Sequence, residues 1–239
     1  MDEDLAPFPM DWQRALVLMA HPDDPEYGAA PAVATWVAAG HEVRYVLGTR
    51  GEAGIAGLPP AESGPLREEE QRRACDQVGV RVLEFLDHPD GRIEATLALR
   101  RDLATAIRRH RPDLVVTLGN HERWAPGIRN SADHRAFGTC VLDAVADAAN
   151  EWIFPELAEA GHAPWAGVRW IAVCSPTPTH SAEVTPEGYR AAVRSLAEHR
   201  RYLAALSDDP VEEQARRVVD MVCPEREGRR AAAFEVYAG

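Results

Sequence analysis

Residues 20–28 read Ala-His-Pro-Asp-Asp-Pro-Glu-Tyr-Gly and place one imidazole and two carboxylates almost side by side. These groups, at His21, Asp23 and Asp24, are of the types that bind a divalent cation and that take a proton from water. A hydrolytic metal site keeps coordination positions open, so three protein ligands are sufficient. Ordinary structural roles are also open to them, because Asp24 is a good helix N-cap and Asp23 a typical turn residue.

The elements around this segment place it where a site is expected. Residues 14–19 form a short apolar run, which is typical of a buried parallel strand. Pro22 disfavours a helical conformation at His21, which should therefore lie at the carboxyl end of that strand. Pro25 fits the first helical position, with Asp24 as the N-cap. In open α/β sheets, ligands bind in the crevice between such a strand and the next helix.

The rest of the chain alternates apolar, β-branched segments with segments of helical periodicity. Predicted strands are 42–47, 81–86, 114–118 and 168–174; predicted helices are 26–39, 65–78, 97–109 and 133–149; irregular loops are 48–60 and 119–130, with a turn at 87–91 and a Pro-rich stretch at 175–180. From residue 186 the chain should be mostly helical, before a short apolar tail at 231–237. Such alternation predicts one Rossmann-like α/β domain over 1–239, a mostly parallel sheet flanked by helices, with the polar loops along the edge that holds His21.

Composition limits the classes of partner. The formal net charge of −12 argues against sequence-independent binding to nucleic acid or to an anionic membrane. The four cysteines are far apart and form no C-x-x-C pair, so we expect reduced thiols rather than disulfides. The acidic start, Met1 to Asp4, and the lack of a long apolar run predict neither a signal peptide nor a spanning helix, and hence a cytoplasmic protein.

Residues 20–24 resemble the signature of the PIG-L/LmbE-like family, metal-dependent N-deacetylases that act on N-acetylglucosamine conjugates. The resemblance implies that His21 and Asp24 bind a divalent metal ion. It leaves Asp23 as the general base, beside a water whose pKa the metal has lowered. Two histidines and one carboxylate suit Zn²⁺, and the same set can hold Fe²⁺.

A second segment, residues 130–136 (Asn-Ser-Ala-Asp-His-Arg-Ala), resembles the family's His-Pro-Asp-His-Arg-Ala motif. The resemblance implies His134 as the third metal ligand and Asp133 as the proton-relay carboxylate that orients the imidazole at the site. A position in the first turn of a helix agrees with this, because the helix dipole disfavours imidazolium and the neutral ring binds metal. A structural role is also open, with Ser131 as the cap of this helix.

The sequence departs from the family at Ser131, where the motif normally opens with a histidine that assists the acetyl carbonyl or the leaving amine. A serine hydroxyl donates a hydrogen bond but is no acid near neutral pH. His121 or His180, each in a predicted loop, could take the role of the missing histidine. We favour Asp23 as both base and acid.

Other positions match the family at residues that contact the sugar. Glu52 lies in a Thr-x-Gly-Glu segment, Arg67 opens an Arg-Glu-Glu helix, and Asp90 follows the third strand. Trp124, in the loop before the second motif, and Ser131 are further expected substrate-side residues. A guanidinium and carboxylates suit a polyol, since each takes paired hydrogen bonds, although all have ordinary surface roles as well.

The resemblance implies hydrolysis of the N-acetyl group of an N-acetylglucosamine-containing conjugate, giving acetate and a free amino sugar. One alternative is an amidase that removes a larger acyl group, and another is a non-catalytic sugar-binding module. The expected partner is therefore a small amino-sugar substrate rather than nucleic acid or membrane. A homo-oligomer is compatible with the sequence, which leaves the conjugate and the native metal open.

Overall fold

The computed structural model describes residues 5–239, so the acidic start at Met1 to Asp4 lies outside the described residues. Within them, nine strands form one sheet, in the order β1-β9-β11-β8-β5-β2-β3-β4, with β10 paired to β11. These are β1 (Ala6–Pro7), β2 (Arg14–Met19), β3 (Glu42–Leu47), β4 (Leu83–Phe85), β5 (Leu114–Leu118), β8 (Trp170–Cys174), β9 (His180–Val184), β10 (Glu225–Arg226) and β11 (Arg229–Ala238).

The core of the sheet is parallel and confirms the predicted α/β class. Strands β4, β3, β2, β5 and β8 all run in one direction, and β2 is almost wholly buried between β3 and β5. The order reverses at β2, because the chain moves outward to β3 and β4 and then returns to β5 on the other side. Ligands of open α/β sheets bind at the carboxyl ends of the strands at such a switch point.

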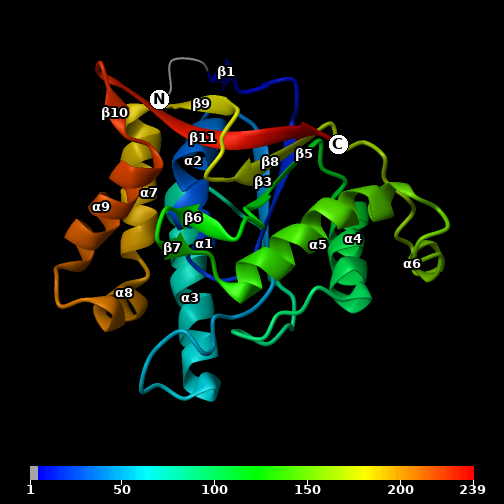
Figure 1. Ribbon diagram of the computed structural model, residues 1–239, viewed down its shortest axis with the longest axis horizontal. Helices are drawn as coiled ribbons and strands as arrows, with labels where there is room; N and C mark the ends of the chain where they lie inside the picture. The colour runs from blue at the N-terminus through cyan, green and yellow to red at the C-terminus, as the bar shows by residue number, and fades with distance from the viewer. Residues whose placement is uncertain (1–4) are drawn as a thin grey trace.

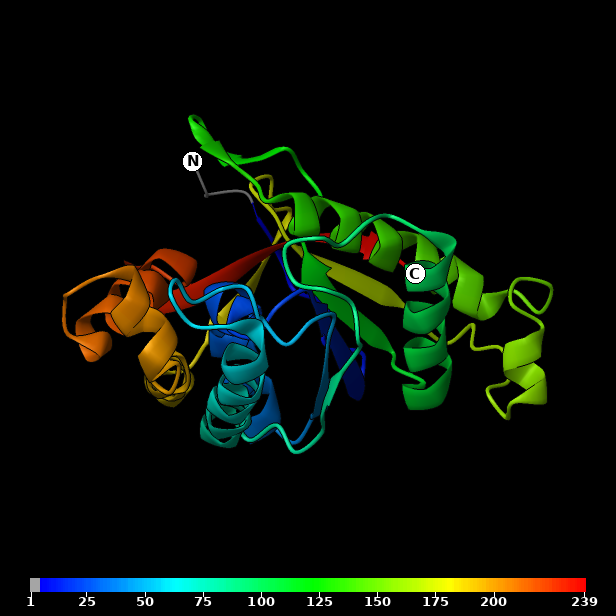
Figure 2. The same cartoon turned by 90° about the horizontal axis from the view of Figure 1, so that it is seen from below.

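Helices cover both faces of the sheet (Figures 1 and 2). On one side lie α1 (Asp24–Gly28), α2 (Ala30–Ala38), α3 (Pro60–Val78) and α7 (Pro186–Ala197), and on the other α4 (Leu97–His110) packs against α5 (Ala132–Ala149). The remaining helices are α6 (Glu156–Glu159), α8 (Arg200–Leu206) and α9 (Val211–Val222), and α9 packs on α7. The described residues contain no helix that is long and apolar enough to span a membrane.

The helix predicted at 26–39 is wrong in two respects. It begins at Asp24, so Asp24 is its first residue and not its N-cap, because Asp23 before it has a left-handed backbone with φ 83°. It also breaks at Ala29, since Pro31 cannot continue a helix from the preceding turn and instead occupies the first turn of α2. At Gly28, a Cβ would lie 2.6 Å from Cys174 Sγ, so only glycine allows α1 to approach the end of β8 so closely.

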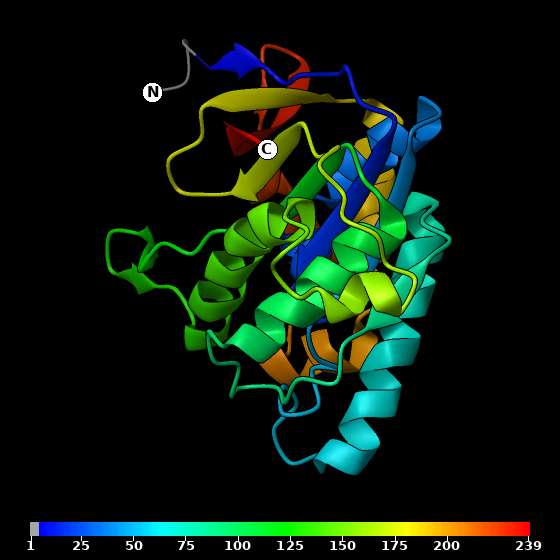
Figure 3. The same cartoon turned by 90° about the vertical axis from the view of Figure 1, so that its right-hand side faces the viewer.

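Other predicted boundaries also differ from those in the structure. Helix α3 starts at Pro60, one turn and more before the predicted Pro65, which lies inside the helix. The predicted loop at 119–130 contains a hairpin, β6 (Arg123–Ala125) and β7 (Ile128–Arg129), which projects from the body of the molecule in Figure 3. From residue 186 the chain is mostly helical, as predicted, and its apolar tail forms β11, which completes the sheet together with β9.

Candidate metal centre and active site

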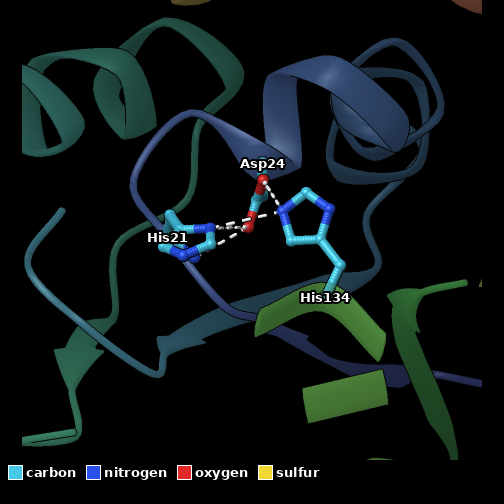
Figure 4. Close-up of side chains that lie close together, drawn as sticks. All are labelled: His21, Asp24 and His134. Atoms are coloured by element: carbon cyan, nitrogen blue, oxygen red, sulfur yellow. Dashed lines mark hydrogen bonds and ion pairs between the residues drawn. The ribbon is translucent and has the colours of Figure 1, made fainter. Parts of the chain in front are cut away.

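Three side chains converge where β2 and β5 end (Figure 4). His21 follows β2, Asp24 opens α1, and His134 lies in the first turn of α5. His21 Nδ1 is 3.2 Å from Asp24 Oδ2, His134 Nε2 is 3.1 Å from Asp24 Oδ1, and the two ring nitrogens are 3.3 Å apart. The sheet thus brings together residues separated by more than a hundred positions in the sequence.

The outer nitrogen of His21 is held by two carboxylates. Its Nε2 lies 3.1 Å from Asp133 Oδ2 and 3.2 Å from Asp90 Oδ1. Asp133 is itself fixed by the backbone N–H groups of Gly91 and Ile93, which donate to its two oxygens. The expected orienting carboxylate is therefore present, but it contacts His21 rather than the neighbouring ring of His134, because residues 133 and 134 point to different sides of α5.

The outer nitrogen of His134 faces Asn130, whose Oδ1 is 3.1 Å from Nδ1. The Asn130 amide donates to the carbonyls of Gly119 and His121, so its oxygen must face the ring. Ser131 Oγ accepts the backbone N–H of His134 and caps α5, as its structural role predicted. The hydrogen-bond network therefore places the N–H group of His21 on Nε2 and that of His134 on Nδ1. The lone pairs of His21 Nδ1 and His134 Nε2 then face Asp24.

This arrangement explains the pKa shifts at the cluster. Burial lowers the pKa of His21, but the charge of Asp24 and the hydrogen bond to Asp133 outweigh burial and hold it well above the ordinary value. The pKa of His134 is raised in the same way by Asp24, against burial. Burial raises the pKa of Asp24, but the two histidines together hold it well below its usual range.

The donor set fits a divalent cation. Two imidazole lone pairs and a carboxylate face one point, and either a proton or a cation is needed there to offset their mutual repulsion. The ligand atoms of His21, Asp24 and His134 lie within 4.8 Å of one another, and so do those of His21, Asp90 and Asp133. The first set has both rings oriented inward. The second set has only the ring of His21, and its two carboxylates, Asp90 and Asp133, already accept hydrogen bonds from backbone N–H groups.

Asp23 is buried beside this cluster. Its Oδ1 accepts a hydrogen bond of 2.9 Å from Arg67 Nη2, and the guanidinium of Arg67 stacks on Tyr202, 3.9 Å from the ring centroid. Burial raises the pKa of Asp23, and the charge of Arg67 opposes this without cancelling it. A carboxylate with a raised pKa is a stronger base and returns its proton less readily to bulk water.

The backbone of Asp23 is held by residues that the sequence analysis missed. Its N–H donates to Gln71 Oε1 at 2.8 Å, and Gln71 Nε2 donates to the carboxylate of Glu26 at 3.2 and 3.3 Å. Glu26 is fully buried and also accepts the hydroxyl of Ser195. Since a left-handed backbone at a non-glycine residue costs about 1–3 kcal/mol, these bonds stabilise the strained turn that aims the Asp23 carboxylate.

A charge swap tests this chain of hydrogen bonds. Gln71→Glu alone places two carboxylates together, and Glu26→Gln alone pairs two amides, so each should lower kcat by about tenfold or more. The double variant restores one carboxylate facing one amide and should recover much of the lost kcat. The coupling free energy calculated from the four kcat values should be about 1–3 kcal/mol. Losses that simply add, or a change in KM alone, would contradict a role in positioning Asp23.

His21, Asp23, Asp24 and His134 line a cavity of about 740 Å³, within the range of about 300–1,000 Å³ typical of small-molecule sites. Of the predicted substrate-side residues, Arg67, Asp90, Trp124 and Ser131 line it. Trp124 also meets His134 edge-on, with ring centroids 6.1 Å apart. Glu52 is not among the lining residues; its carboxylate accepts the N–H of Asp90 and so supports that loop.

The two loop histidines considered as substitutes for the missing acid lie elsewhere. His121 Nε2 is 3.5 Å from Glu235, and His180 Nδ1 is 2.8 Å from the hydroxyl of Thr179. Neither is among the residues that line the cavity. Of the three candidates for the general acid, only Asp23 lines the cavity. All four cysteines are buried and unpaired, as expected, and Cys174 forms part of the cavity wall.

Comparison with known proteins shows to which family the chain belongs. Residues 16–145, more than half of the chain, match the model of the family described as PIG-L, GlcNAc-PI de-N-acetylase. The chain belongs to this family. The matched region includes every residue predicted for the site, from His21 to His134, and excludes α8 and α9, which contribute Tyr202, Leu206 and Met221 to the cavity.

Among curated proteins, the chain is similar to a diacetylchitobiose deacetylase of Thermococcus kodakarensis, with 29% identity over 137 residues. The similarity covers 56% of this chain and spans only half the length of that relative. Among solved structures, the N,N′-diacetylchitobiose deacetylase of Pyrococcus horikoshii has a TM-score of 0.83 at 22% identity, covering 95% of this chain and 84% of its own.

The same fold also carries other chemistry. GalB of Pseudomonas putida, a 4-carboxy-2-hydroxymuconate hydratase, has a TM-score of 0.66 at 22% identity, covering 94% of this chain and 95% of its own. At such identities the likeness shows the fold alone. The reaction of this PIG-L family member therefore has to be argued from its site.

Proposed function

We propose that this protein hydrolyses the N-acetyl group of an N-acetylglucosamine-containing conjugate, releasing acetate and a free amino sugar. The observation that carries the proposal is the position of Asp23: a buried carboxylate with a raised pKa, beside two inward-facing imidazoles and Asp24, in one cavity. Because β9 and β11 join the C-terminal third to the same sheet, we also propose that residues 1–239 act as one domain.

His21, Asp24 and His134 are the proposed metal ligands, with Zn²⁺ as the proposed ion and Fe²⁺ as the alternative. When bound, the ion would supply a Lewis acid that makes water nucleophilic near neutral pH. The network around the cluster supports this, because Asp133 and Asn130 hold each ring in the orientation that a ligand requires.

Asp23 acts as the base and then as the acid. It takes a proton from the attacking water as the oxygen bonds to the amide carbonyl carbon, and it gives that proton to the nitrogen as the carbon–nitrogen bond breaks. Arg67 and the strained backbone hold the carboxylate in place for both transfers. We propose that Arg67, Asp90, Ser131 and Trp124 contact the sugar, and that Glu52 acts through the Asp90 loop.

Metal content and amine release test this proposal together. Protein purified without chelators should contain about one equivalent of zinc or iron by elemental analysis, and should release free amine from N-acetylglucosamine or its conjugates, detected with an amine-reactive fluorophore. Removal of the metal by a chelator should abolish release, and added Zn²⁺ or Fe²⁺ should restore it. Metal-free protein that is still active would contradict the assigned centre, and metal-loaded protein inactive on all such amides would contradict the reaction.

A further inference from the structure

The mouth of the cavity carries an unusual group of exposed side chains. Of the nine large apolar side chains exposed within residues 5–239, four line this one cavity: Tyr27, Ile128, Leu206 and Met221, with exposed fractions of 39, 58, 55 and 74%. We call these four the apolar rim. Single exposed apolar residues are common, but four around one entrance mark a binding surface.

The rim comes from separate parts of the fold. Tyr27 lies in α1, Ile128 in the β6–β7 hairpin, Leu206 at the end of α8 and Met221 in α9. The wall beneath the rim is also largely apolar, formed by Leu118, Trp124, Cys174 and Tyr202. The rim therefore surrounds a hollow that leads inward to the candidate metal centre, rather than forming a flat face.

The hollow extends along α9. A second cavity, of about 450 Å³, shares Tyr27 and Met221 with the first and continues along α9 to Gln214, Arg217, Val218 and Asp220, so the charged groups of this second cavity lie only beyond the rim. A ligand held at the metal centre thus has room to extend outward over the rim.

The polar and apolar parts of the main cavity are separated. Its charged groups, Asp23, Asp24, Arg67 and Asp90, gather around His21 at the inner end. The rim offers no charged group and one phenolic hydroxyl. Sugar hydroxyls placed against such a surface would lose water without gaining partners, whereas an apolar group buried there is stabilised.

We propose that the natural substrate is an N-acylated amino sugar that carries an apolar group of several carbons, and that the rim binds this group. This inference rests on the proposed hydrolysis of an N-acyl amino sugar. With the apolar group on the anomeric oxygen it narrows the proposed deacetylation, and with a longer acyl chain on the nitrogen the acid released would be that chain in place of acetate. The apolar group is attached either to the anomeric oxygen or, as a longer acyl chain, to the nitrogen, and both attachments present the same chemistry to the rim. A second copy of this chain seated on the rim would close the entrance to the metal centre, which argues for substrate as the occupant.

The test compares N-acetylglucosamine, its octyl glycoside and N-octanoylglucosamine, each below its critical micelle concentration. At least one octyl compound should exceed N-acetylglucosamine in kcat/KM for amine release by about tenfold or more. Preference for the glycoside or for the octanoyl amide identifies the attachment. The double variant Leu206→Ser with Met221→Ser should remove most of the preference. Leu97→Ser, which removes another exposed leucine outside the cavity, should leave the preference unchanged.

The failures of the two proposals are distinguishable. Amine release without any preference for octyl compounds would overturn the role of the rim and leave the deacetylase proposal intact. If no compound is hydrolysed, calorimetric binding still decides: octyl compounds should bind about tenfold more tightly than N-acetylglucosamine, and equal binding overturns the inference. Wild-type dimers that the double variant dissociates, with no change in preference, would show instead that the rim is an interface between copies.

Discussion

Asp23→Asn is expected to lower kcat for amine release by about 10²–10⁴-fold while the protein still binds its metal, because an amide of the same shape cannot accept the proton of the attacking water. Asp23 is not one of the three proposed ligands, so metal content should stay at the wild-type level. The measurements are kcat by amine release and metal equivalents by elemental analysis on the same preparation.

Loss of the Asp23 charge also leaves Arg67 without its carboxylate partner, so stability must be measured separately. Thermal unfolding of the metal-loaded variant shows whether enough folded protein is present at the assay temperature. Arg67→Lys is the useful companion, since it keeps a positive charge near Asp23 but loses the stacking on Tyr202; it should lower kcat much less than Asp23→Asn. An Asp23→Asn variant with near-normal turnover would remove this residue from the mechanism.

His134→Ala is expected to lose both metal and activity, because it removes one of the three proposed protein ligands. Asn130→Ala should give a graded effect: the ring of His134 remains but its orientation is no longer fixed, and metal affinity should fall by about 10–100-fold. Titration of the metal-free variants with Zn²⁺, followed by equilibrium dialysis, measures both.

His180→Ala is the matched control, since this histidine bonds to Thr179 outside the cavity. It should retain wild-type metal content and activity. Full metal occupancy in His134→Ala would exclude the assigned ligand set. Loss of activity in His180→Ala would instead reopen the question of the general acid.

The parallel core of the fold was predictable because its signals are local. The apolar run at 14–19 and the strand at 114–118 need no distant partner to be recognised, and both match β2 and β5. Alternation with helices then places His21 and the loop before His134 at one edge. What sequence patterns cannot show is the strand order, which puts β2 beside β5 and so makes these two loops neighbours.

The parts of the site that escaped prediction depend on tertiary contacts. Gln71 has an ordinary place in a polar helix, and only packing of α3 against residues 22–26 brings its amide to the N–H of Asp23. Tyr202 comes from the C-terminal third, outside the residues that match the family model, and no local pattern connects it with Arg67. The left-handed backbone of Asp23 was not predicted, because Pro25 indicated a helix with Asp24 as its N-cap. Glu26 is visible next to the first motif in the sequence, but its burial is apparent only in the fold.

The strand β11 has a consequence for the order in which the protein folds. It lies antiparallel between β8 and β9, although β9 ends at Val184 and β11 begins only at Arg229. Until β11 inserts, β8 and β9 have unpaired edges facing one another, and pairing of such sequence-distant strands is slow. The intervening residues form α7, α8 and α9, so the helices that carry Tyr202, Leu206 and Met221 are closed into a loop by the same event. We therefore expect the cavity to form late, together with the last step of sheet assembly, and a folding intermediate to contain the proposed metal ligands before it contains the part of the cavity wall formed by α8 and α9.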